Sequence, residues 1–348
     1  MLPPKPAHPL TPFPRGWYLA AHADELQAGD VRPLRLFGRD LVLLRDAGGA
    51  AHLVDAYCPH LGAHLGRGGK VVGDCIRCPF HGWEFNAGSG ACERTANGDP
   101  APPKARLERW PLLERHGMLL VWFHEQREPA SWDVGELPEL DEPGWSQWHH
   151  REWTLRTTIQ DVSENDADVA HSPVMHGFTE GMPDLEMDAD GARCNWGMQA
   201  VVKLGHFGVP QVPVLGPLLR IPERAPSRIS VTRWGLSLGW IRTTLDLPAG
   251  LKFRSQTLAT TTPIDHEHVR LTLRHRVRRV PVIGGLVLGN YSRLFNNIVS
   301  QDIEIWEHKI YRMRPVASRS DWAVLRFRRW ARQFYDPAAY DAAHAEAT

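Results

Sequence analysis

Cysteine and histidine occur together in two short segments in the first third of the chain. Cys58-Pro59-His60 is the first segment and Cys78-Pro79-Phe80-His81 is the second, with seventeen residues between His60 and Cys78. A [2Fe–2S] cluster can take two thiolates on one iron and two imidazoles on the other. Each segment supplies one ligand of each kind. We therefore interpret Cys58, His60, Cys78 and His81 as the ligands of such a cluster.

Other interpretations of these residues remain open. Zinc also binds two cysteines and two histidines, although zinc fingers usually place the two cysteines in one arm and the two histidines in the other. Cys75 and Cys78 form a C-x-x-C pair, which occurs in redox proteins. The Pro-Phe-His that follows Cys78 favours Cys78 as a ligand and Cys75 as a buried structural thiol. All four could also be ordinary core residues.

A second group of metal-binding side chains lies near the middle of the chain. His171 and His176 follow Asn165 and Asp168. We expect a helix over residues 162–170, in which Asp168 and His171 share one face because they are three residues apart. Two imidazoles need a third ligand. Two histidines and one carboxylate with open positions are typical of oxygen-activating Fe(II).

Asp302 is the candidate for the third ligand. It lies in a predicted long helix over residues 288–314, on the apolar stripe that includes Ile298, Ile305 and Trp306. A buried carboxylate without a partner is costly, so Asp302 should face a cation. That cation is either iron or a buried arginine or histidine.

Asp168 and Asn165 then have supporting roles. Asp168 can hydrogen-bond a ligand histidine, as carboxylates around metal sites do, or it is a solvated helix acid. Asn165 can orient water or oxygen near the iron, or it only stabilises the helix. We count both among the candidate catalytic residues.

The remaining pattern predicts an α+β protein. Residues 1–15 read as an extended proline-rich arm, 16–125 as a small all-β domain, 126–150 as a linker, and 151–348 as a mixed domain that holds the second site. We expect a hairpin with its turn at 38–40 and strands over 51–56, 118–123 and 155–159. Further sheet is expected over 229–241 and 256–278, and a helix break at Pro173 because the residue before proline avoids the α region.

Composition excludes several classes of protein. Lys plus Arg and Asp plus Glu are both 40, so there is no net charge to attract nucleic acid. We find no apolar run long enough for a membrane span and no signal peptide at the start. Five cysteines are an odd number and argue against a disulfide framework. We expect a soluble cytoplasmic protein, of bacterial origin on its Ala-, Arg- and Pro-rich composition.

The two motifs together resemble the Rieske non-haem iron oxygenases, terminal oxygenase component. Asn165, Asp168, His171 and His176 match the iron motif of that family, N-x-x-D-x-x-H-x-x-x-x-H. The segments 55–63, 78–83, 164–171 and 303–309, with Trp330 and Gln333–Tyr335, resemble the branch of cholesterol 7-desaturase (Neverland-type) and 3-ketosteroid 9α-hydroxylase. The animal desaturases begin with a membrane anchor, which we do not find here.

The resemblance implies a helix-grip catalytic domain and a head-to-tail homotrimer. In such a ring the [2Fe–2S] cluster of one subunit lies near the mononuclear Fe(II) of the next, with Asp168 between them. It also implies that a separate reductase or ferredoxin supplies electrons and that O2 is the oxidant. This agrees with the sequence, in which we find no dinucleotide-binding fingerprint.

The substrate is the least defined part of the prediction. We expect a hydrophobic small molecule, a sterol or steroid, with desaturation of the cholesterol 7-desaturase type first. Hydroxylation of a 3-ketosteroid, or oxidation of an aromatic or alkaloid-like molecule, is the alternative. A third hypothesis is an electron-transfer or iron-sensing protein with the cluster alone. The apolar segment 207–221 is either a mouth for the substrate or a loop packed on a neighbouring subunit.

Overall fold

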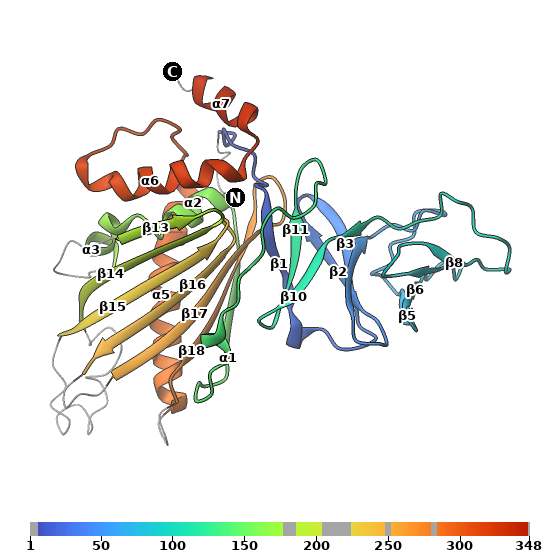
Figure 1. Ribbon diagram of the computed structural model, residues 1–348, viewed down its shortest axis with the longest axis horizontal. Coiled ribbons are helices and arrows are strands. Elements are labelled where there is room, and N and C mark those ends of the chain that lie inside the picture. The colour runs from blue at the N-terminus through green and yellow to red at the C-terminus, as the bar shows by residue number, and fades with distance from the viewer. Residues whose placement is uncertain (1–5, 177–185, 204–223, 248–251, 280–283, 347–348) are drawn as a thin grey trace. The chain divides into compact units, whose positions relative to one another are not determined.

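The computed structural model describes residues 6–176, 186–203, 224–247, 252–279 and 284–346. The chain forms two compact units (Figure 1). The smaller consists of Arg15–Leu137 with Thr262–His266, and the larger of Met1–Pro14, Pro138–Thr261 and Glu267–Thr348. The predicted α+β class is confirmed, because the first unit is built from small sheets and the second combines a large sheet with helices.

The smaller unit contains three antiparallel sheets. Their strand orders are β1-β11-β10, β2-β3-β4-β9 and β5-β6-β7-β8. The strands are β1 (Gly16–His22), β2 (Val31–Leu36), β3 (Arg39–Arg45), β4 (Ala51–Asp55), β5 (Lys70–Val72), β6 (Cys75–Arg77), β7 (Glu84–Asn86), β8 (Cys92–Arg94), β9 (Arg109–Trp110), β10 (Leu112–Arg115) and β11 (Met118–Phe123). A short 3-10 helix, η1 (Ala23–Glu25), follows β1.

The predicted hairpin is present, but its turn lies earlier than expected. Leu36 pairs with Arg39, so Phe37 and Gly38 form a two-residue turn. Their φ values are 53° and 70°, as a type I′ turn requires at both positions. Phe37 tolerates this strained conformation because its ring is buried against Phe123, with ring centroids 4.5 Å apart.

The larger unit is organised around a seven-stranded antiparallel sheet of order β12-β18-β17-β16-β15-β14-β13. Its strands are β12 (His149–Leu155), β13 (Glu186–Asp190), β14 (Arg193–Lys203), β15 (Arg224–Trp234), β16 (Leu238–Asp246), β17 (Lys252–Pro263) and β18 (Val269–Val277). Its helices are α1 (Pro138–Asp141), α2 (Ile159–Glu164), η2 (Val169–His171), α3 (Ser172–Met175), α5 (Gly284–His308), η6 (Arg319–Asp321), α6 (Trp322–Ala331), η7 (Arg332–Phe334) and α7 (Pro337–Glu346).

Helix α5 lies along one face of this sheet (Figure 1). Leu155, Leu271, Val299 and Trp306 are among the buried side chains that join the sheet to the helix. The predicted long helix is therefore present, although it ends at His308 and not at residue 314. No helix in the described part of the chain has the length and apolar content that a membrane crossing needs.

Three local predictions around the second motif are wrong. The strand expected over 155–159 ends at Leu155, and Ile159 begins α2 because Thr158 caps that helix through its side chain. The helix expected over 162–170 ends at Glu164. Pro173 does not break a helix; it stands in the first turn of α3, where a proline costs no hydrogen bond.

The apolar segment over residues 207–221, the candidate mouth for the substrate, lies outside the described residues.

His275 is a fully buried histidine between the sheet and α5. It is 0% exposed, and burial lowers the pKa of its imidazole to about 4. The folded state therefore disfavours the protonated ring. The contribution of His275 to the free energy of unfolding is fully present above pH 6.5, the ordinary pKa of histidine. This contribution falls as the pH drops below 6.5 and levels off below pH 4.

We expect acidification from pH 7 to pH 5 to cost about 2 kcal/mol through this group, at about 1.4 kcal/mol for each pH unit. His275→Gln should remove this part of the acid sensitivity. Thermal unfolding of both proteins between pH 7 and pH 5 measures the difference. His308→Gln, which removes an exposed imidazole on α5, is the control. Equal acid sensitivity in wild type and His275→Gln would contradict the assignment.

Candidate iron centres

The two Cys/His segments of the smaller unit fold into two loops of the same design. Cys58 accepts a backbone hydrogen bond from Gly62 (2.9 Å), and Cys78 accepts one from Gly82 (3.1 Å). Each cysteine N–H in turn donates to the residue that follows the glycine, Ala63 or Trp83. Gly62 and Gly82 have φ values of 76° and 69°, which a side chain would strain. The glycine thus closes each loop around its cysteine.

The loops bring the four predicted ligands together in pairs. The Cys58 thiol is buried and accepts backbone N–H groups of His60 and Leu61; burial, with the adjacent Cys78 sulfur as a smaller cause, raises its pKa to about 11. The rings of His60 and His81 lie 4.8 Å apart. His60 Nδ1 is buried without a hydrogen-bond partner among the described residues. Adjacent buried sulfurs and an unsatisfied imidazole nitrogen fit the cluster ligands of two thiolates and two imidazoles.

Cys75 is not one of the four predicted cluster ligands, and its thiol has different neighbours. Its thiol is buried and approaches Glu93 Oε2 at 3.3 Å and Asp74 Oδ1 at 3.6 Å. Burial and the two carboxylates raise the pKa of Cys75 to about 12, so the group is a thiol at neutral pH. Reactive and metal-binding cysteines need the thiolate, so this environment fits the structural thiol that the sequence indicated.

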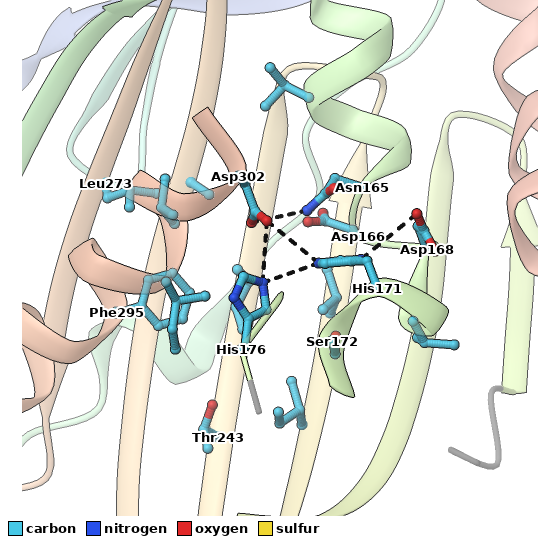
Figure 2. A pocket seen from close by; sticks show the side chains of 18 of the residues that line it. Asn165, Asp166, Asp168, His171, Ser172, His176, Thr243, Leu273, Phe295 and Asp302 are labelled. Atoms are coloured by element: carbon cyan, nitrogen blue, oxygen red, sulfur yellow. Dashed lines mark hydrogen bonds and ion pairs between the residues drawn. The ribbon is translucent and has the colours of Figure 1, made fainter. Parts of the chain in front are cut away.

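In the larger unit, His171, His176 and Asp302 converge at one point (Figure 2). His171 ends η2, His176 follows α3, and Asp302 lies in the C-terminal third of α5. The two Nε2 atoms are 3.2 Å apart, and Asp302 Oδ1 is 3.7 Å from His171 Nε2 and 3.2 Å from His176 Nε2. Asp302 is 6% exposed. Two imidazole nitrogens and a buried carboxylate oxygen that face one another fit a divalent metal of the 2-His-1-carboxylate type.

Three side chains lie beside this triad, and Figure 2 shows two of them, Asn165 and Asp168. Asn165 Nδ2 donates to the second carboxylate oxygen of Asp302 (3.2 Å). Asp168 Oδ2 lies 3.8 Å from His171 Nδ1. Gln301 Oε1 lies 2.9 Å from His176 Nδ1. Hydrogen bonds to Asn165 and Gln301 therefore orient Asp302 and His176, whereas Asp168 lies beside His171 Nδ1 beyond hydrogen-bond distance.

Helix α2, which leads into the histidine segment, is anchored by buried charges. Glu164 is 4% exposed and pairs with Arg328 of α6 through two contacts of 2.9 Å. Lys309, the residue after α5, reaches Asp161 Oδ1 at 3.0 Å. This network ties the end of α5, which carries Asp302, to the start of the segment that carries the histidines.

A cavity opens beside the triad, between the sheet and α5. Its apolar lining consists of Val162, Val169, Met198, Ile229, Val231, Ile241, Ala259, Leu271, Leu273, Leu294, Phe295, Ile298, Val299 and Trp306. Arg233 also lines it and is neutralised by an ion pair with Asp166. The cavity therefore suits a mainly apolar molecule held next to the triad.

Sequence reasoning missed some of the residues in this site. The contact of Gln301 with His176 could not be predicted, because a glutamine next to an aspartate is common on the surface of a helix. Arg233 and Asp166 are 67 residues apart, and their pairing depends on a strand position that single-sequence periodicity does not give. Glu164 stands next to Asn165, but its charged partners, Lys309 and Arg328, come from beyond residue 308.

The comparisons with known proteins agree with this geometry. Residues 16–111 match the model of the Rieske [2Fe-2S] domain, and residues 121–335 match that of the 3-ketosteroid 9alpha-hydroxylase C-terminal domain. Cholesterol 7-desaturase nvd of Xenopus laevis is 30% identical over 93% of this chain and 72% of its own length. The oxygenase component of 3-ketosteroid-9-alpha-monooxygenase of Rhodococcus rhodochrous is 28% identical over 93% of this chain and 84% of its own.

Solved structures share the fold. Dicamba monooxygenase bound to 3,6-dichlorosalicylic acid superposes with a TM-score of 0.71 at 17% identity, over 94% of this chain and 98% of that one. NdmA of Pseudomonas putida CBB5 with caffeine gives 0.70 at 19%, over 94% of each.

Fold and sites thus define an iron-dependent oxygenase with a cluster domain and a catalytic domain. The chain belongs to the Rieske non-haem iron oxygenases, in the family of the 3-ketosteroid 9alpha-hydroxylase C-terminal domain. This confirms the predicted enzyme class, an O2-dependent oxidoreductase, and its two cofactors, the [2Fe–2S] cluster and the mononuclear iron.

Proposed function

We propose that Cys58, His60, Cys78 and His81 hold the cluster, and that His171, His176 and Asp302 hold the mononuclear iron. The convergence of the His171, His176 and Asp302 side chains beside an apolar cavity is the observation that carries the proposal. The iron supplies O2 activation when bound. Asn165 keeps one oxygen of Asp302 engaged, so the other faces the histidines. The cluster domain corresponds to residues 16–125, the linker to 126–150 and the catalytic domain to 151–348, after an arm of 15 residues.

The proposed substrate is a sterol or steroid, as in both named relatives. The apolar lining of the cavity favours a hydrocarbon body over a polar metabolite. Desaturation, as in cholesterol 7-desaturase, removes two hydrogens from the substrate, and O2 with two electrons and two protons leaves as two waters. Hydroxylation inserts one oxygen atom and releases one water. A separate reductase supplies the two electrons in either case.

The test is turnover of the iron-loaded protein with a reductase, O2, and either cholesterol or a 3-ketosteroid. Mass spectrometry distinguishes a product two hydrogens lighter from one oxygen heavier. We expect a sterol product that depends on O2 and on the reductase. Turnover of an aromatic or alkaloid-like substrate and of no steroid would move the chain to the alternative substrate class.

Asp302→Ala tests the proposed iron ligands separately from the substrate. It should abolish turnover and lower the iron content from about three to about two per chain, because three-ligand binding needs the carboxylate. The visible spectrum of the cluster should remain. Glu304→Ala, which removes an exposed carboxylate from the same helix, is the matched control. Full iron content in Asp302→Ala would show that another residue is the third ligand.

We further propose a head-to-tail homotrimer in which electrons cross between subunits. Apolar side chains next to both centres are exposed: Leu61 (65%) and Phe80 (63%) beside the cluster histidines, and Val174 (85%) between the iron histidines. Exposed apolar groups at functional sites mark contact surfaces. Asp168, whose side chain is 39% exposed beside His171, is placed to receive a neighbouring ligand histidine.

Mixed oligomers test this electron path. Asp302→Ala chains keep the cluster, and His81→Ala chains keep the iron triad, so each homo-oligomer should be inactive. Co-expressed and purified through two different tags, the mixed oligomers should recover part of the wild-type activity, because an intact cluster then faces an intact iron in another chain. Mixed oligomers that assemble with full iron triads yet stay inactive would show that electrons move within one chain.

We propose a cytoplasmic location for the protein, on its amino-acid composition alone. The relatives named above come from an animal and a bacterium, so they give no support to a bacterial origin.

A further inference from the structure

The segment over residues 309–332, which runs from the end of α5 through α6, concentrates positive charge in a chain that is neutral as a whole. It holds eight lysines and arginines and a single acidic residue, Asp321, whereas the whole chain holds 40 of each kind. The rest of the chain is left with 32 basic and 39 acidic residues. Such a separation of charge favours a contact between this segment and an acidic partner.

Most of these charges face solvent without a partner. Lys309 and Arg328 pair with carboxylates of α2, and Arg332 pairs with one of α7. The carboxylate of Asp321 is bound to Ser318. The remaining five basic side chains are exposed and have no carboxylate partner among the described residues; they are Arg312, Arg314, Arg319, Arg326 and Arg329.

Large apolar side chains are exposed in the same segment. Val316 is 106% exposed, Trp322 is 41% exposed and Ile310 is 40% exposed. A single exposed apolar side chain is ordinary on a protein surface, but a group of them within a few residues indicates a contact surface. The segment therefore combines positive charge with apolar area.

Helix α6 presents these side chains along one stripe. Trp322, Arg326 and Arg329 are exposed and follow one another at spacings of four and three residues, so they share one face of the helix. Phe327 and Trp330 are buried on the opposite face. The outer face of α6 is thus aromatic at its first turn and basic beyond it.

The loop before α6 lies against the same helix (Figure 1). Arg328 Nη1 donates to the carbonyl oxygen of Arg312 (2.6 Å), and the Arg328 guanidinium lies 4.3 Å from the centre of the Tyr311 ring. These contacts hold the loop beside the helix. We call the exposed side chains of both the basic surface; they are Ile310, Arg312, Arg314, Val316, Arg319, Trp322, Arg326 and Arg329.

We infer that the basic surface binds the face of an anionic lipid bilayer. Arginine head groups attract anionic lipids, and their aliphatic stems lie along apolar area. An indole ring such as that of Trp322 is suited to the level of the lipid head groups, and a side chain such as Val316 to the acyl boundary below them. The cytoplasmic leaflet carries the negative charge that this contact needs.

A bilayer fits the basic surface better than an acidic protein does. The electron donor is the acidic protein that such an oxygenase could require, but it must reach the cluster, which we place in the smaller unit. The basic surface belongs to the larger unit. An apolar substrate accumulates in membranes, so an enzyme bound there collects it. This benefit rests on the proposed function, whereas the binding of lipid does not.

The test is sedimentation of the full-length, iron-loaded protein with vesicles of phosphatidylcholine alone and with vesicles that contain about 30% phosphatidylserine. We expect binding to the anionic vesicles to be at least about tenfold stronger, and to be lost as the salt rises from about 0.1 M to about 0.5 M because salt screens the charges. Equal binding to both vesicles, or binding to neither, would overturn the inference.

Variants locate the contact on the protein. Arg326→Gln combined with Arg329→Gln should weaken binding to the anionic vesicles about 25-fold, at about fivefold for each arginine. Arg228→Gln combined with Arg254→Gln removes the same charge from exposed strand positions of the same unit and should leave binding unchanged.

Val316→Ser is a second variant, in which loss of folding is excluded because the side chain is fully exposed. It should weaken binding about threefold through lost apolar area. Wild-type binding in both the double arginine variant and Val316→Ser would overturn the inference.

Other occupants of the basic surface would give different results. If wild type binds no vesicles and the double arginine variant changes its oligomeric state, the surface contacts a second copy of the chain. If wild type binds no vesicles and that variant raises the KM for the reductase, the surface contacts the electron donor. Either result overturns the inference. Vesicle binding without turnover of any steroid would keep the inference and refute the proposed substrate.

Discussion

The larger unit depends on one electrostatic constraint, which is the burial of the Asp302 carboxylate. A buried carboxylate is stable only beside a cation or several hydrogen-bond donors. Asn165 supplies one donor to one oxygen, and the other oxygen faces two histidines. The side chains therefore create a need for positive charge at the point where we propose the mononuclear iron. The need for metal and the need for stability coincide there.

Much of the surrounding structure keeps that point fixed. The triad comes from two segments more than 120 residues apart, and a shift of either would separate its atoms. Lys309, at the end of α5, pairs with the buried Asp161 and Glu164 of α2, and Arg328 of α6 pairs with Glu164 as well. Breaking such a pair leaves an unpaired charge in the interior, which costs about 3–5 kcal/mol. The same interactions that stabilise the unit thus align the histidines with the aspartate.

The sequence predicted which side chains come together better than it predicted the elements that carry them. Cys58, His60, Cys78 and His81 are close in sequence, so spacing alone suggested their partnership. Asp302 was found because a carboxylate on an apolar helix stripe is an anomaly. The helix expected around Asp168 was wrong because Thr158 starts α2 earlier, and Asn165–Asp168 form turns that end it. Capping and tertiary contacts decided those boundaries, and local periodicity contains neither.

The buried polar contacts around His275 show what the sequence could not predict. Thr257, His275, Tyr291 and Asn296 are ordinary residues at unremarkable spacings, and each has a plain structural explanation alone. They come from β17, β18 and α5, so only strand pairing and the packing of α5 on the sheet bring them within hydrogen-bond distance. Local periodicity can place each residue on a strand or a helix, but it does not contain the tertiary contact that makes them partners.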